Sequence, residues 1–247
     1  MEIKKIETPK NLFSLLSANE KSQLHALGKI HVFAKDQYIY QAVKSDKFIY
    51  ILLDGHAKIF HVSQLGKEVI LWFCSEGEMF GLAECLVGEK RKTFAQVSST
   101  TSSVLSIPDV EFKHFLENNP KCAIKIIQLL SDRMCRLSNA LLILATENVE
   151  SRVIHVLNLL AESHGTNDAH FIKIDFHITH QEIADMIGSS RQTVTSTINH
   201  FKKQNRLQVK NHHIHLIKDT WFNSRQSTTP LSLKHAANKQ KSLSTFA

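Results

Sequence analysis

The sequence predicts an α+β protein with an antiparallel β-roll, then a long helix, then a C-terminal winged helix-turn-helix. Three observations support this fold class. Gly55, Gly66, Gly77 and Gly88 recur every 11 residues between strand-like runs, apolar residues recur every seven after Pro120, and two helix-capping signals lie between residues 179 and 192. With 247 residues, 43% hydrophobic and 21% charged, the chain can bury the cores of two modest domains.

The strands of the roll are expected where short β-type runs lie between turn signals. They are residues 30–33, 38–40, 48–53, 57–62, 68–73, 93–97 and 103–107. Short strands at such spacing favour an antiparallel roll or sandwich, and we expect few helices among them.

After Pro108 the apolar period becomes helical. A short helix is expected from Val110 to Leu116, and a long one from Pro120 to about Ala145. Within the long helix, apolar residues alternate in steps of four and three, which is typical of a coiled-coil seam and favours a parallel homodimer. The predicted interface consists of Ile127, Leu130, Met134, Leu137, Leu141 and Leu144. The alternative is a core helix that lies on the roll.

A helix-turn-helix is expected further along the chain. A helix over residues 149–164, a loop over 165–170 and a strand over 171–174 precede it. Thr179 and Glu182 fit a capping box, and Gly188 ends the first helix. The run from Ser189 to Gln192 supplies a second capping pattern, after which residues 194, 198 and 201 face inward.

The second helix of this motif presents a polar face opposite its apolar one. In such motifs that face reads base edges in the major groove. The predicted DNA contacts are Thr179, His180, Gln181, Ser190, Arg191, Gln192, Thr193, Thr195, Ser196, Asn199 and Lys202. Residues 207–209 and 214–217 are expected to form a wing, and Lys202, Lys203, Arg206 and Lys210 to meet phosphates. The alternative is an αα-hairpin with a solvated basic face.

Charge agrees with a nucleic-acid partner. Residues 1–190 hold 20 Lys and Arg against 22 Asp and Glu, whereas residues 191–247 hold 10 against 1. A neutral body with a cationic end favours a polyanion, with nucleic acid ahead of a membrane surface. Part of this charge lies in a Ser-, Thr- and Lys-rich stretch from about Arg225, which we expect to be a disordered basic tail.

A cytoplasmic protein without a membrane association is expected. The longest apolar run, Leu141 to Ala145, is far too short for a membrane helix, and residues 1–10 lack the apolar core of a signal peptide. Cys74, Cys85, Cys122 and Cys135 form no CxxC pair. Neither a disulfide framework nor a zinc finger is therefore expected.

Four stretches together resemble the Crp/Fnr family of bacterial transcription regulators. They are residues 77–84 (GEMFGLAE), the Asn119-Pro120 pair, residues 150–153 (ESRV) and residues 180–194 (HQEIADMIGSSRQTV). The resemblance implies a cyclic-nucleotide-binding-like β-roll (residues 1–118), a dimerisation helix (119–146), a winged DNA-binding domain (147–222) and a tail (223–247). It implies as partners a near-palindromic double-stranded DNA operator, a second copy of the chain and RNA polymerase.

The same resemblance locates an effector pocket at Gly81, Leu82, Arg91, Lys92, Thr93, Leu137 and Ser138. In cyclic-AMP-responsive relatives a Glu follows the glycine and an Arg-Ser pair grips the phosphate. Here those positions carry Leu82 and, by an ungapped count, Lys92-Thr93, while Arg91 is expected to point the other way in an extended chain. A cyclic nucleotide therefore stays possible with altered contacts. The alternative is a packed roll that has lost nucleotide binding.

The sequence also bears on other cofactors and on catalysis. Nothing before Cys74 could ligate an iron–sulfur cluster, so none is expected, whereas 15 histidines leave haem open. His212, His213 and His215 alternate faces on the wing, so a metal site is not predicted there. The chain has no P-loop, nucleophile elbow or HExxH motif, and no catalysis is expected. The alternative hypothesis is a cyclic-nucleotide-binding module that regulates a partner protein.

Overall fold

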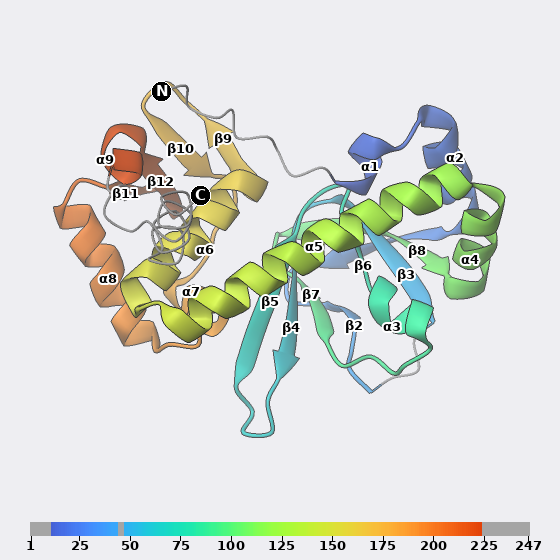
Figure 1. Ribbon diagram of the computed structural model, residues 1–247, viewed down its shortest axis with the longest axis horizontal. Helices are drawn as coiled ribbons and strands as arrows, with labels where there is room; N and C mark the ends of the chain where they lie inside the picture. The colour runs from blue at the N-terminus through green and yellow to red at the C-terminus, as the bar shows by residue number, and fades with distance from the viewer. Residues whose placement is uncertain (1–10, 44–46, 224–247) are drawn as a thin grey trace, which may run out of the picture.

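The computed structural model describes residues 11–43 and 47–223 (Figure 1). The predicted tail from about Arg225 lies outside the described residues. The helices are α1 (Leu12–Leu15), α2 (Ala18–Leu27), α3 (Leu82–Val87), α4 (Asp109–Asn118), α5 (Pro120–Thr146), α6 (Val149–His164), α7 (His180–Ile187), α8 (Arg191–Lys203) and α9 (Lys218–Asn223).

The strands form three antiparallel sheets. Those of the roll are β1 (Lys29–Ala34), β2 (Tyr38–Tyr40), β3 (Phe48–Asp54), β4 (Ala57–Val62), β5 (Glu68–Cys74), β6 (Met79–Phe80), β7 (Phe94–Val97) and β8 (Thr101–Pro108). The third sheet contains β9 (Gly165–Asn167), β10 (Phe171–Ile174), β11 (Leu207–Lys210) and β12 (His213–Ile217).

The N-terminal part is the predicted antiparallel β-roll. One sheet has the order β1-β8-β3-β6 and the other β2-β7-β4-β5. Tyr50, Leu52, Phe80 and Val104 belong to a core that draws on both sheets. The fold class is thus confirmed.

The short helix predicted from Val110 to Leu116 is confirmed as α4, whereas α1 and α2 were not located from the sequence. Leu24 of α2 and Phe112 and Phe115 of α4 pack with Ile49 and Ile51 of β3. These helices supply a second apolar layer for the sheet that contains β3. Helix α1 has only four residues and α2 buries only Leu24, so no apolar period marks either helix.

Helix α5 begins at Pro120, as predicted, and crosses the roll diagonally (Figure 1). Its buried residues Cys122 and Ile126 pack with the same core as α4. By contrast, three residues of its heptad row are open to solvent: the exposed fraction is 60% for Ile127, 64% for Met134 and 67% for Leu141. Packing on the roll therefore accounts for one side of α5 and leaves most of the predicted seam uncovered, although Leu130 is partly buried against this core.

The C-terminal part packs on the roll. Phe60, Ile70 and Phe73 of the roll belong to one core with residues of α6, α7 and α8, including Leu157 and Ile183. The predicted helix over residues 149–164 is confirmed. The loop expected after it is partly wrong, because β9 pairs with β10 through Thr166 and Lys173. No helix of the described residues is long and apolar enough to cross a membrane.

Candidate nucleic-acid interface and effector pocket

Helix α7 begins with the capping box that the sequence predicts. The amide of Glu182 donates to the Thr179 hydroxyl at 3.1 Å, and the amide of Thr179 donates to the Glu182 carboxylate at 2.8 Å. Gly188 ends the helix with φ 65°, and its amide donates to the carbonyl of Ala184. Since few residues other than glycine adopt this conformation readily, Gly188 sets the tight turn between α7 and α8.

Helix α8 begins one residue later than the predicted capping pattern. The amide of Thr193 donates to the Ser190 hydroxyl at 3.1 Å, so Ser190 is the N-cap. The amide of Ser189 instead donates to the carbonyl of Ala184. The inward residues of α8 are as predicted, since Val194, Ile198 and Phe201 are fully buried.

The opposite face of α8 is open to solvent. Its exposed residues include Arg191, Gln192, Thr193, Ser196, Asn199, Lys202 and Lys203. The side chains on this face can donate and accept hydrogen bonds over about three turns of helix. Such a surface can read the edges of bases in a major groove.

Two of the predicted contact residues also join the helices of the motif. Nδ1 of His180 lies 2.9 Å from the hydroxyl of Thr195, which itself donates to the carbonyl of Arg191 at 2.8 Å. Burial lowers the pKa of His180, and the positive charges of Lys202 and Arg191 lower it further. The His180–Thr195 contact therefore joins α7 to α8.

The wing forms as expected, with β11 paired to β12 through Val209 and Ile214. Lys202, Lys203 and Lys210 are exposed, but Arg206 is not available to phosphates. Its guanidinium is buried over the rings of Phe201 and Trp221, at 4.6 and 5.1 Å from their centroids. A cation that follows a helix can be part of a core when aromatic rings surround it, which its position in the sequence does not reveal.

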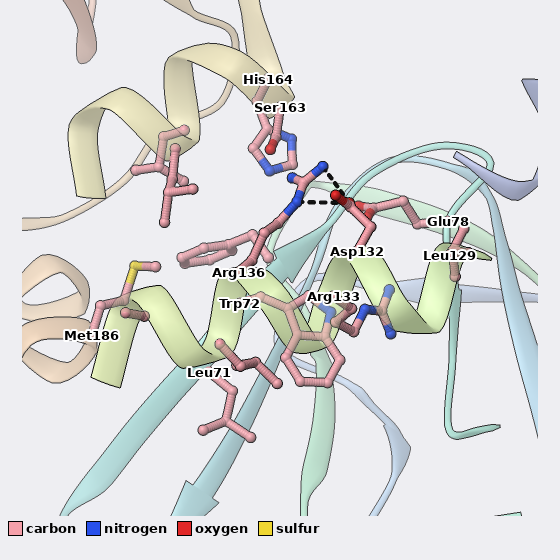
Figure 2. A pocket seen from close by; sticks show the side chains of 15 residues that line it. Leu71, Trp72, Glu78, Leu129, Asp132, Arg133, Arg136, Ser163, His164 and Met186 are labelled. Carbon is pink, nitrogen blue, oxygen red and sulfur yellow. Dashed lines mark hydrogen bonds and ion pairs between the residues drawn. The ribbon is translucent and has the colours of Figure 1, made fainter. Parts of the chain in front are cut away.

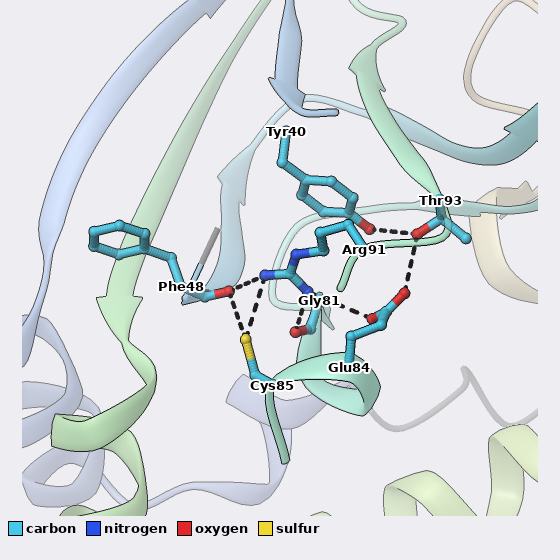
Figure 3. Close-up of polar contacts among 7 residues, drawn as sticks. All are labelled: Tyr40, Phe48, Gly81, Glu84, Cys85, Arg91 and Thr93. Carbon is cyan, nitrogen blue, oxygen red and sulfur yellow. Dashed lines mark hydrogen bonds and ion pairs between the residues drawn. The ribbon is translucent and has the colours of Figure 1, made fainter. Parts of the chain in front are cut away.

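The effector positions meet around an interior arginine (Figure 3). Arg91 is 2% exposed, and its guanidinium donates to the carbonyl of Gly81 at 2.5 Å and to the carbonyl of Phe48. It also pairs with Glu84 at 3.4 Å. Gly81 has φ 72°, and a Cβ there would lie 2.9 Å from the guanidinium. This close approach requires a glycine.

The predicted roles of Arg91 and Lys92 were therefore reversed. Lys92 is exposed and pairs with Glu89. Strand β7 begins only at Phe94, so the alternation of an extended chain does not apply at Arg91. Thr93 does lie near the arginine, because the hydroxyls of Thr93 and Tyr40 are 3.1 Å apart. Tyr40 was missed. In the sequence it is marked only as the last residue of a short strand-like run, residues 38–40.

Two family models match this chain. The cyclic nucleotide-binding domain covers residues 30–119, and the Crp-like helix-turn-helix domain covers residues 151–220. This chain is a member of the Crp/Fnr family. The two matches correspond to the roll and to the part that carries α7, α8 and the wing.

Among curated relatives, the global nitrogen regulator of Nostoc sp. is 28% identical over 73% of this chain and 81% of its own length. The CRP-like cAMP-activated global transcriptional regulator of Mycobacterium tuberculosis is 24% identical over 70% of this chain and 76% of its own length. The structure of a CooA mutant from Carboxydothermus hydrogenoformans has a TM-score of 0.74 at 21% identity, covering 90% of this chain and 99% of that one. These relatives are named as transcription regulators or share the fold.

This Crp/Fnr member fits a cyclic nucleotide poorly at the residues present. Leu82 is buried in an apolar core and has no acceptor for a ribose hydroxyl. The Arg91 guanidinium already binds the carbonyls of Gly81 and Phe48. Leu137 and Ser138 are exposed on α5, and no hydrogen bond joins either to the Arg91 cluster among the described residues. Arg91 and the rings of Tyr40 and Tyr50 thus occupy the space next to Gly81.

Proposed function

We propose that this Crp/Fnr member is a homodimeric transcription regulator without enzymatic activity. It binds a near-palindromic operator through two α8 helices, acts in the cytoplasm and meets RNA polymerase. The observation that carries the proposal is the solvent-exposed polar face of α8, held by two caps and by the His180–Thr195 contact. The net positive charge of residues 191–247 supports attraction to DNA.

Helix α5 supports the dimer. Ile127, Met134 and Leu141 lie along one side of the helix and stay exposed in the protomer. A second copy of α5 would cover them, since seven-residue spacing matches a two-stranded coiled coil. Two α8 helices related by a two-fold axis would then meet successive major grooves.

DNA binding is tested by selecting bound sequences from a random duplex pool and measuring their affinity by mobility shift. We expect an operator with two inverted half-sites. Arg191→Ala should weaken operator binding by about 1 to 3 kcal/mol per half-site, because a guanidinium at this position can pair with guanine. Non-specific binding should hardly change.

Lys202→Ala is the matched control, because its exposed ammonium can reach phosphates on any sequence. It should weaken operator and random DNA alike. Equal losses on both DNAs for Arg191→Ala would assign Arg191 to the backbone. Failure to select any sequence would favour the alternative, a cyclic-nucleotide-binding module that acts on a partner protein.

A further inference from the structure

A cavity apart from the predicted effector pocket lies where the roll, α5 and the C-terminal part meet (Figure 2). Its volume is about 130 Å³. The residues that define it include Trp72 of β5, Arg136 and Leu137 of α5, Leu160 and His164 of α6, and Met186 of α7. Of the effector positions that the family resemblance implies, only Leu137 lines it. The cavity is thus separate from the Arg91 cluster.

One end of the cavity is polar. Nε and one terminal nitrogen of Arg136 pair with Asp132, at 2.9 and 2.7 Å. Among the described residues nothing pairs with its other terminal nitrogen or with the hydroxyl of Ser163, and both residues line the cavity. Figure 2 shows the Arg136 guanidinium extended toward Ser163 and His164. This end can therefore donate hydrogen bonds to a single anionic group.

The carboxyl groups beside this end of the cavity disfavour an anion that carries more than one negative charge. Glu78 and Asp132 also line the cavity, and burial raises the pKa of Glu78. Arg133 is already engaged, since it donates to the carbonyl of Met79 at 3.1 Å and stacks on Trp72. One free donor nitrogen beside two carboxyl groups suits a monocarboxylate better than a phosphate, which carries more negative charge.

The rest of the cavity is apolar. Leu71, Leu137, Ala140, Leu160 and Met186 line it. An apolar cavity of about 150 Å³ in another protein admits benzene. The cavity here is slightly smaller but opens toward solvent, so it has room for one six-membered ring with a carboxylate at the polar end.

We propose that this cavity binds a small ring-bearing monocarboxylate, with the carboxylate at Arg136 and Ser163 and the ring among Leu137, Leu160 and Met186. Such a ligand would contact the roll, the dimerisation helix and the helix-turn-helix at once. If the proposed function holds, its binding biases the position of α7 and α8, so that occupancy changes operator affinity. Binding itself does not depend on that function.

The test is calorimetric titration of the full chain with benzoate and with benzyl alcohol, which keeps the ring and removes the charge. We expect benzoate to bind with a dissociation constant below about 1 mM. Arg136→Gln should weaken benzoate at least tenfold and leave benzyl alcohol unchanged. Lys121→Gln, an exposed cation on the same helix, should change neither.

Ala140→Phe should abolish binding of both probes, because Ala140 lines the cavity and a phenyl group would fill it. Leu142→Phe is its control, at an exposed position that does not line the cavity. If Ala140→Phe fails to fold, Ser163→Phe fills the polar end instead. Benzoate binding that survives the filled cavity, or no binding by the unsubstituted chain, would overturn the proposal.

The proposed function is separated from this inference by measuring operator affinity with and without benzoate. Benzoate binding to a chain that recognises no operator would contradict the regulator and leave the site intact. Operator binding without any benzoate binding would contradict the proposed site and leave the proposed regulator intact.

Discussion

The guanidinium of Arg91 lies 4.6 Å from the centroid of the Tyr40 ring, inside the β-roll. Tyr40 is itself stacked on Tyr50, with 5.5 Å between ring centroids, and Tyr50 on Phe80 at the same distance. An interior cation over an aromatic stack thus occupies the space beneath the Gly81 loop (Figure 3). Such a contact is strongest when both partners are removed from water.

Arg91→Leu should destabilise the chain by about 3 kcal/mol, because the carbonyls of Gly81 and Phe48 and the carboxylate of Glu84 lose a buried donor. Urea unfolding followed by circular dichroism measures the change. Lys92→Leu is the control at the adjacent exposed position, and its midpoint should not move. Equal midpoints for the two variants would show that the Arg91 cluster contributes nothing to stability.

Cyclic AMP and cyclic GMP should bind weakly or not at all. A ribose hydroxyl beside Leu82 would be buried without its partner, at a cost of about 1 to 3 kcal/mol. A phosphate would also have to draw Arg91 away from the carbonyls it binds. Calorimetry on nucleotide-free protein checks this, and micromolar binding of either nucleotide would contradict it.

Leu141→Lys should yield monomers with a folded roll. Leu141 is 67% exposed in the protomer, so the substitution spares the protomer core. Two like charges buried across a two-fold axis cost several kcal/mol. Sedimentation velocity measures the outcome. Leu142→Lys is the control, since Leu142 is 62% exposed but lies outside the heptad row; a dimeric Leu141→Lys protein would remove the coiled-coil interpretation.

A histidine pair joins the roll to the C-terminal part. The His164 ring lies 5.7 Å from His56, the Ser75 hydroxyl lies 2.5 Å from Nδ1 of His164, and Phe176 stacks on His56. Burial, together with the neighbouring charge of His56, lowers the pKa of His164 from 6.5 to about 3, while Asp175 opposes the shift. Both rings are therefore neutral in the folded protein at neutral pH.

Acidification should weaken this contact. Below pH 6.5 His164 is protonated in the unfolded chain, whereas in the folded chain it stays neutral down to about pH 3. The folded state therefore loses about 1.4 kcal/mol per pH unit for each such proton as the pH falls through this range. Urea unfolding at pH 7 and pH 5 measures the loss. His164→Gln should reduce the pH dependence, whereas His170→Gln, at an exposed side chain, should leave it intact.

Local signals predicted the structure well, and long-range contacts did not follow from them. Thr179, Glu182 and Gly188 act on backbone atoms a few residues away, so the sequence located α7 closely. Arg91 and Arg206 have core partners far along the chain, such as Phe48 and Trp221. Nothing in their immediate neighbours distinguishes them from exposed cations.

The cavity beside Arg136 could not be predicted from the sequence either. Trp72, Arg136, Leu160 and Met186 lie on four elements, and only the packing of the C-terminal part on β5 brings them together. Strand β9 was missed for a related reason, since Thr166 is the one β-branched residue of Gly165–Asn167 and the strand forms through its pairing with β10.

The core shared by Phe60, Phe73, Ile183 and Val194 has a consequence for how the chain melts. Heat cannot remove the C-terminal part from the roll without exposing large apolar side chains on both, so the two should unfold in one calorimetric transition. A fragment that begins at α6 would expose the apolar surface that packs on the roll, and it should aggregate. If the proposed function holds, substitutions at Phe73, which packs against the C-terminal part, would also change operator binding without touching DNA.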